Sequence, residues 1–137
     1  MKAYELKETK DIALEQLLHL YQSVGWDNYT SAADKLKKGV ECSLKVITAW
    51  ADEQLLGLIR AVGDGSTILY IQDLLVLPEY QNQGIAFTLM NQMLASYPQV
   101  RQKVLMTEEA ADVRYFYEKC GFYSADKGVG VAFYRFD

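Results

Sequence analysis

The chain has 137 residues, half of them hydrophobic and 23% charged, a balance typical of one folded domain with a buried apolar core. We therefore expect a single domain over residues 1–137. The net charge is −4, and the longest basic run is Lys37–Lys38. This argues against nucleic-acid binding, which usually needs a concentrated positive face.

The sequence shows no signal for secretion, membrane insertion or metal binding. Met1–Lys7 lacks the apolar core of a secretory signal, and the longest apolar stretch, Thr67–Pro78, is too short to span a membrane. Cys42 and Cys120 are isolated, without metal-ligand spacing. They could form a disulfide, but reduced thiols in the cytoplasm are what we expect. We expect no metal and no membrane partner, and leave a homodimer open.

The first half of the chain predicts two helices followed by strands. Apolar residues recur at helical spacing over residues 10–22. A second helix is predicted from a cap at Thr30 or Ser31 to about Lys38, with Gly39 as its stop. The strands expected next are Lys45–Ala51, Leu55–Val62 and Ser66–Leu77.

In the second half, Pro78 ends the long strand because proline lacks an amide donor. The segments expected next are a helix over Gly84–Ser96, a short buried strand over Lys103–Thr107, a helix over Ala110–Cys120 stopped by Gly121, and a last strand over Val129–Phe136 with Gly130 as a bulge. Hairpins followed by a β-α-β crossover predict an α+β (mixed α/β) fold with one central sheet.

The segment Leu75–Ala86 has the residues of an anion-binding turn. A strand ends, a short loop follows and a helix begins, where free N–H groups and the helix dipole bind anions. Gly84 leaves the backbone accessible to a phosphate. A P-loop would need Gly-Lys-Ser/Thr and a dinucleotide fold three glycines, and neither is present. Taken alone, Gly84 equally fits a tight turn of purely structural importance.

Two segments resemble the GNAT superfamily of N-acetyltransferases. Gln81–Ala86 matches its pattern Gln/Arg-x-x-Gly-x-Gly/Ala after a strand ending in Val-x-Pro, and Phe116–Phe122 resembles its Phe-Tyr-x-x-x-Gly-Phe segment. The resemblance implies a mostly antiparallel twisted sheet of about six to seven strands, splayed at the fourth, with about four helices. Ala110 stands where many members have Asn, and the final small residue of the first pattern is Ala86.

The resemblance also implies that acetyl-CoA is the cosubstrate. Main-chain groups of the strand end and the loop would contact it, and the expected cofactor-binding residues are Leu75, Val76, Leu77, Gln81, Asn82, Gln83, Gly84, Ile85, Ala86 and Phe87. A backbone N–H of the splayed strand would stabilise the charge that develops on the thioester oxygen.

Tyr117 and Asp73 are the candidate catalytic residues. By resemblance, the Tyr117 hydroxyl lies near the cofactor sulfur, where a phenol can protonate a leaving thiolate; the alternative is a core aromatic. Asp73 interrupts an apolar strand, and a buried unpaired charge is costly. It would bind or deprotonate the amine, or pair with Arg60 on the neighbouring strand.

Other titratable groups are weaker candidates. Glu108 and Glu109 fit a solvated helix start, and His19, the single histidine, fits a surface position.

We expect the aromatic stretch between the first two predicted helices to select the acceptor. Tyr21, Trp26 and Tyr29, with Asp73, are the expected substrate-binding residues, although Trp26 would equally seal the core. The pattern looks most like a bacterial branch related to arylalkylamine (serotonin-type) acetyltransferases, which implies a small aromatic or alkyl amine. A protein or peptide acceptor, and an acyl-CoA-binding module without turnover, remain the alternatives.

Overall fold

The computed structural model describes residues 3–137, and the chain divides into two compact units, Met1–Met106 and Thr107–Asp137. The first unit is built on a sheet with the strand order β1-β2-β3-β4-β5. Its strands are β1 (Glu5–Glu8), β2 (Lys45–Ala51), β3 (Gln54–Gly63), β4 (Ile68–Val76) and β5 (Gln102–Leu105). Strands β1 to β4 pair antiparallel, and β5 is parallel to β4.

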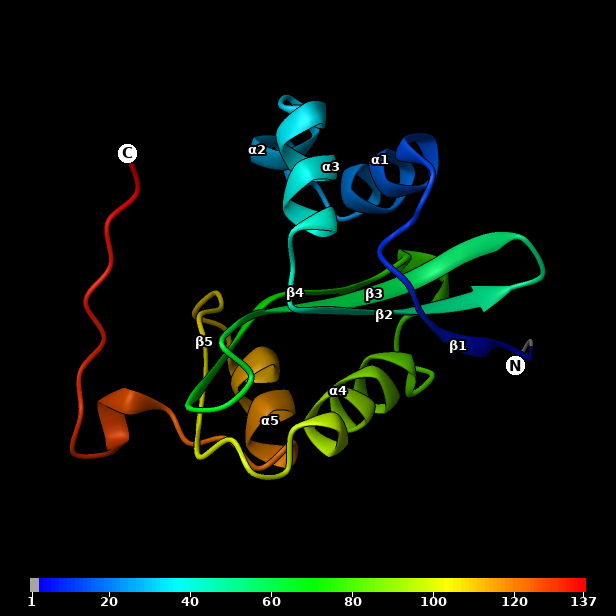
Figure 1. The fold of residues 1–137 in the computed structure, drawn as a ribbon. Helices are drawn as coiled ribbons and strands as arrows, with labels where there is room; N and C mark the ends of the chain where they lie inside the picture. The colour runs from blue at the N-terminus through cyan, green and yellow to red at the C-terminus, as the bar shows by residue number, and fades with distance from the viewer. Residues whose placement is uncertain (1–2) are drawn as a thin grey trace. The chain divides into compact units, whose positions relative to one another are not determined.

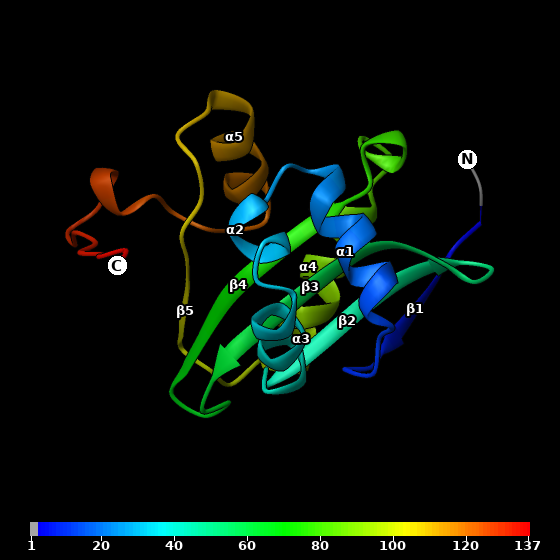
Figure 2. The same cartoon turned by 90° about the horizontal axis from the view of Figure 1, so that it is seen from above.

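Helices cover both faces of this sheet. One face carries α1 (Leu14–Ser23), α2 (Asp27–Thr30) and α3 (Ala33–Glu41), and the other carries α4 (Ile85–Ser96) (Figures 1 and 2). This two-sided cover explains why residues 55–61 of β3 are all buried, since a strand covered on both faces reads as a continuous apolar run. Leu58, Ile59, Leu89 and Met93 belong to the resulting core.

Strand β4 continues beyond its pairing with β5. The two strands pair from Ile68 with Gln102 to Ile71 with Leu105, whereas β4 continues to Val76. Residues 73–76 of β4 still pair with β3. The edge of β4 that faces β5 is therefore open at its C-terminal end, which agrees with the expected splay at the fourth strand.

The second unit contains α5 (Ala111–Lys119) and a 3-10 turn at Ala125–Lys127. The strand predicted over Val129–Phe136 is wrong: these residues form no strand. Alternating Val129, Val131 and Phe133 have high β-propensity, but a strand also needs a hydrogen-bonded neighbour, and none of the described strands pairs with this segment.

Several boundaries differ from prediction. Within residues 3–137 the sheet has five strands instead of six to seven, and the single-turn α2 raises the number of α-helices to five. The short polar β1 was missed. The predicted strand Lys103–Thr107 is Gln102–Leu105 and is half-buried. Gly39 lies inside α3 and does not end it, because its backbone does not adopt the left-handed conformation of a glycine that terminates a helix.

None of the helices in residues 3–137 combines the length and the apolar character needed to cross a bilayer.

Candidate active site

The predicted anion-binding loop is a strand-to-helix connection in the first unit. After β4, Leu77 leads into a 3-10 turn at Pro78–Tyr80, and α4 begins at Ile85 with Gly84 as its N-cap. The first backbone bond of the helix joins Thr88 N to Gly84 O at 3.0 Å. The amides of Ile85 and Ala86 therefore lie in the first turn, where the helix itself provides no acceptor.

Backbone conformation explains two of the loop residues. Gly84 has φ +87° and Asn82 has φ +63°, a left-handed region that favours glycine and tolerates asparagine. A Cβ built on Gly84 would meet no heavy atom within 4 Å. The space above the helix start is therefore open, and residues 81–84 are all exposed. An anion can approach the amides directly, so the loop fits a phosphate group.

The loop is tied to the end of β4 by one side chain. Gln81 donates from Nε2 to the main-chain oxygen of Val76 at 3.0 Å. Leu77 N donates to Leu56 O on the β3 side at 2.8 Å. Because successive residues of a strand direct their main-chain groups to opposite edges, the Val76 amide faces the open edge of β4. A hydrogen-bond donor thus lies beside the anion-binding segment Gln81–Ala86, which we call the cradle.

Asp73, on β4, lies in a buried ionic cluster with partners from three other elements, β3, α1 and α2. It is 3% exposed, and its Oδ2 accepts from Arg60 Nε at 2.6 Å and from the Tyr21 hydroxyl at 2.9 Å. Its Oδ1 accepts from the Tyr29 hydroxyl at 2.7 Å. Both carboxylate oxygens therefore have partners. These contacts favour the pair with Arg60, one of the two readings of the sequence.

The same cluster brings together the three aromatic residues expected at the acceptor side. The rings of Tyr21 and Tyr29 have centroids 5.0 Å apart, and Trp26 lies 5.8 Å from Tyr21 and 6.1 Å from Tyr29. Tyr21 is fully buried, whereas Trp26 and Tyr29 are half-buried. Burial, reinforced by the negative charge of Asp73, raises the pKa of both phenols, so both hydroxyls keep their proton at neutral pH.

Tyr117 lies on α5 of the second unit. It is half-buried, and its ring contacts Phe116 at 5.1 Å and Phe122 at 6.2 Å between centroids. Burial raises its pKa above the usual tyrosine value, against the effect of a hydrogen bond with Thr107. A phenol in this environment stays protonated at neutral pH and can act as a proton donor.

The weaker candidates have ordinary surroundings. Glu109 pairs with Arg114 at 2.6 Å, and Arg114 also pairs with Asp126 at 3.0 Å, which makes a surface ion network. His19 is exposed. Ala110 is the N-cap of α5 and makes no side-chain capping bond.

Two members of the cluster were not expected as site residues. Arg60 was considered only as a partner for Asp73, and Gln72, which donates to the Tyr29 hydroxyl at 3.0 Å, was not considered. An arginine within the apolar run of β3 was the available signal, since a buried charge requires a partner.

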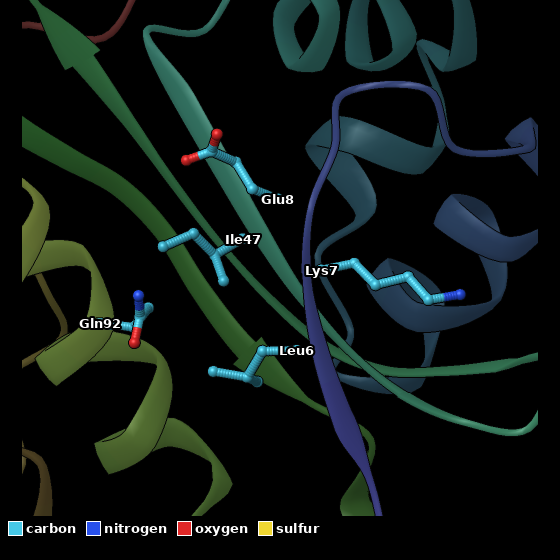
Figure 3. A pocket seen from close by; sticks show the side chains of 5 residues that line it. All are labelled: Leu6, Lys7, Glu8, Ile47 and Gln92. Atoms are coloured by element: carbon cyan, nitrogen blue, oxygen red, sulfur yellow. The ribbon is translucent and has the colours of Figure 1, made fainter.

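A hollow of about 200 Å³ lies elsewhere on the first unit, between β1, β2 and α4. It is lined by Leu6, Lys7, Glu8, Ile47 and Gln92 (Figure 3), and the Lys7 side chain points away from it. None of the predicted site residues belongs to it. No group of three or more metal-ligating side chains occurs within residues 3–137.

Comparison with known proteins shows the family of this chain. The family model described as "Acetyltransferase (GNAT) domain" matches residues 9–133. An uncharacterized N-acetyltransferase (ycf52) of Porphyra purpurea is 28% identical, over 98% of this chain and 78% of that protein. A GNAT-family acetyltransferase structure from Streptococcus pneumoniae is 35% identical, with a TM-score of 0.85 over 98% of this chain and 100% of that one.

The aminoglycoside acetyltransferase AAC(6')-Iy, solved with a CoA bisubstrate analogue, has a TM-score of 0.74 at 18% identity over 99% of both chains, a likeness of fold. The class defined by the fold, the cradle and these matches is that of the acetyltransferases. The chain belongs to the GNAT acetyltransferase domain family, and it is an acyl-CoA-dependent N-acetyltransferase.

Proposed function

We propose that this protein transfers the acetyl group of acetyl-CoA to a primary amine, with small aromatic or alkyl amines as the favoured acceptors. The observation that carries the proposal is the cradle beside the open edge of β4. Unpaired amides of Ile85 and Ala86, and open space above Gly84, suit the pyrophosphate of the cosubstrate. The residues that would hold it are Leu75, Val76, Leu77, Gln81, Asn82, Gln83, Gly84, Ile85, Ala86 and Phe87.

Acetyl-CoA would supply the acetyl group as a thioester. The open main-chain edge of β4 can hydrogen-bond an extended chain as a neighbouring strand would. The Val76 amide is the donor we assign to the thioester oxygen, where charge develops during attack. The neutral amine forms the new C–N bond, the C–S bond breaks, and the amine releases its surplus proton to water.

Tyr117 is the group that we assign to protonate the leaving thiolate. Its buried phenol keeps its proton at neutral pH. Because a thiol with a pKa near 8.5 is a stronger acid than a phenol, the transfer to the thiolate is completed when the proton released by the amine returns through water to the Tyr117 oxygen.

Asp73 has a different role in this proposal from that of a base. Because both of its oxygens accept hydrogen bonds inside the protein, the carboxylate holds Tyr21 and Tyr29 in place instead of binding the amine directly. The half-buried rings of Trp26 and Tyr29 are the surface we assign to the acceptor. Aromatic faces bind aromatic groups and cations, which supports an arylalkylamine-type substrate.

We place the enzyme in the cytoplasm, since Cys42 and Cys120 are free thiols and reduced cysteines are usual there. A second candidate class of acceptor comes from AAC(6')-type neighbours and from a metagenomic aminoglycoside acetyltransferase solved with sisomicin at 18% identity. Aminoglycosides therefore belong in the test panel.

A thiol-release assay tests the proposal. Purified protein is mixed with acetyl-CoA and a panel of arylalkylamines, alkyl diamines, aminoglycosides and lysine peptides. Release with a small amine, and acetylated product in the mass spectrum, is the expected result. Binding of acetyl-CoA without release from any acceptor would favour a binding module, and release with peptides alone would favour a protein acetyltransferase.

A further inference from the structure

The turn between α1 and α3 contacts the sheet through Tyr29, whose hydroxyl group and ring both meet the Arg60 guanidinium. This acceptor turn, Trp26–Tyr29, follows Gly25, which has φ +77°. Trp26 N donates to Tyr21 O at 3.2 Å, which links the turn to α1. Its polar link to the strands passes through the Tyr29 hydroxyl, which contacts both β3 and β4.

That hydroxyl uses its full hydrogen-bonding capacity inside the protein. It donates to Asp73 Oδ1 at 2.7 Å and accepts from Gln72 Nε2 at 3.0 Å and Arg60 Nη2 at 3.3 Å. A phenol has one donor and two acceptor positions. Tyr29 therefore has no polar position left for a substrate, and what it can offer an acceptor is its ring.

Arg60 is the residue that joins the parts of this cluster. Its guanidinium contacts Asp73 on β4 and Tyr29 on the acceptor turn, and its Nη1 donates to Gly39 O at 3.4 Å and to Ser43 Oγ at 3.3 Å. It is 7% exposed. One planar fork thus ties β3, β4, the acceptor turn and α3 together, which a lysine cannot do.

We propose that Arg60 is a positioning residue for acceptor selection: through Asp73 and Tyr29 it holds Trp26–Tyr29 on the sheet and so presents the rings to the amine. This inference rests on the proposed function for its effect on the acceptor. The statement that Arg60 fixes the turn does not depend on that function, because it is based on the contacts of Arg60 with Asp73 and Tyr29. Selection is then by ring face and shape, without a hydrogen bond from the Tyr29 hydroxyl.

The test uses Trp26 as a reporter. The chain contains two tryptophans, Trp26 and Trp50, so Trp50→Phe leaves Trp26 as the single emitter. In this background we compare Arg60→Lys, which keeps the charge but loses the fork, with the double variant Arg60→Met/Asp73→Leu. The double variant removes both charges, so it avoids the unpaired buried charge that could unfold a single variant.

Leu69→Ala is the matched control. Leu69 is fully buried on β4 but makes no contact in the cluster described above, and its truncation leaves a cavity that destabilises the fold about as much as breaking a buried ion pair. Leu69→Ala therefore shows the effect of lost stability alone, with the contacts of Arg60 to Asp73 and Tyr29 intact. Acrylamide quenching of Trp26 is measured in every variant, followed by KM for the acceptor and for acetyl-CoA.

We expect acrylamide to quench Trp26 more strongly in both Arg60 variants than in the Trp50→Phe parent. The increase should be smaller in Arg60→Lys than in the double variant, and Leu69→Ala should show no increase. Acceptor KM rises about tenfold or more, while KM for acetyl-CoA is unchanged. Unchanged quenching in the Arg60 variants, or equal quenching in Leu69→Ala, would overturn the proposal, and so would an equal rise in both KM values. If the parent protein acetylates no amine, the proposed function fails, and the quenching still decides whether Arg60 fixes the turn.

Discussion

Gln81 donates a hydrogen bond from its side chain to the main-chain oxygen of Val76, 3.0 Å away. The contact holds the first residue of the cradle against the end of β4. It also occupies the oxygen of Val76 on the open edge of the strand, so the amide of Val76 is the group left for a ligand there. This hydrogen bond therefore fixes the position of the loop that would bind the pyrophosphate relative to the strand that would bind the acyl end.

Removing this contact should weaken cosubstrate binding. In Gln81→Ala the loop loses its tie to β4, and we expect the Kd for acetyl-CoA, measured by calorimetry, to rise about three- to tenfold, the value of one neutral hydrogen bond. Gln92→Ala is the control, because Gln92 is exposed on α4 outside the cradle. Equal affinities in the two variants would contradict the assigned role of Gln81.

Gly84 should matter for both stability and binding. Gly84→Ala places a Cβ at φ +87°, which costs about 1–2 kcal/mol of folding free energy, and the methyl group enters the open space above the helix start. We expect a lower Tm and weaker acetyl-CoA binding. Gly25→Ala meets similar strain at φ +77° with no atom within 4 Å, so it should lower Tm without changing cosubstrate affinity. If Gly25→Ala lost acetyl-CoA affinity to the same extent, the weaker binding in Gly84→Ala would follow from lower stability and not from the methyl group in the cradle.

Tyr117→Phe should separate catalysis from binding. We expect kcat to fall about a hundredfold or more, the range for a general acid, with little change in Kd for acetyl-CoA. Because burial raises the pKa of Tyr117, the phenol remains protonated, and able to donate, up to a pH above its usual value. The alkaline decline of kcat in the parent enzyme should therefore begin above about pH 10.

Tyr115→Phe is the control for this substitution. Tyr115 lies on the same helix and is 69% exposed, so its hydroxyl should be dispensable. Full activity in Tyr117→Phe would show that another group, or water, protonates the thiolate.

The sequence predicted the elements that carry local signals and missed those that depend on partners. Pro78 and Gly84 mark a strand end and a helix start by their own backbone chemistry, and the structure has both. Val129–Phe136 has the composition of a strand, but strand formation depends on a neighbour that composition does not reveal. Gly39 was predicted to stop a helix, but a glycine ends a helix in this way only where its backbone is left-handed, which the residue type alone does not reveal.

The site shows the same division. The cradle could be predicted because its residues are consecutive. The interpretation of Asp73 stayed open because its partners lie 13, 44 and 52 residues away along the chain, and the saturation of the Tyr29 hydroxyl can be seen only when all three of its contacts are known.

Tyr21 should make stability depend on pH in the alkaline range. Burial, then Asp73, raises its pKa in the folded state, so its contribution is fully present below the unfolded value near 10 and is lost as the pH rises further. Tyr21→Phe removes the bond to the Asp73 carboxylate, and we expect a loss of about 1.5–3 kcal/mol at pH 7 in urea unfolding. It should also reduce the fall in stability between about pH 10 and 11. Tyr134→Phe, at a 68% exposed position, should leave both the stability and its pH profile unchanged. A Tyr21→Phe protein with parental stability at pH 7 would mean that the bond between Tyr21 and Asp73 adds no net stability to the cluster.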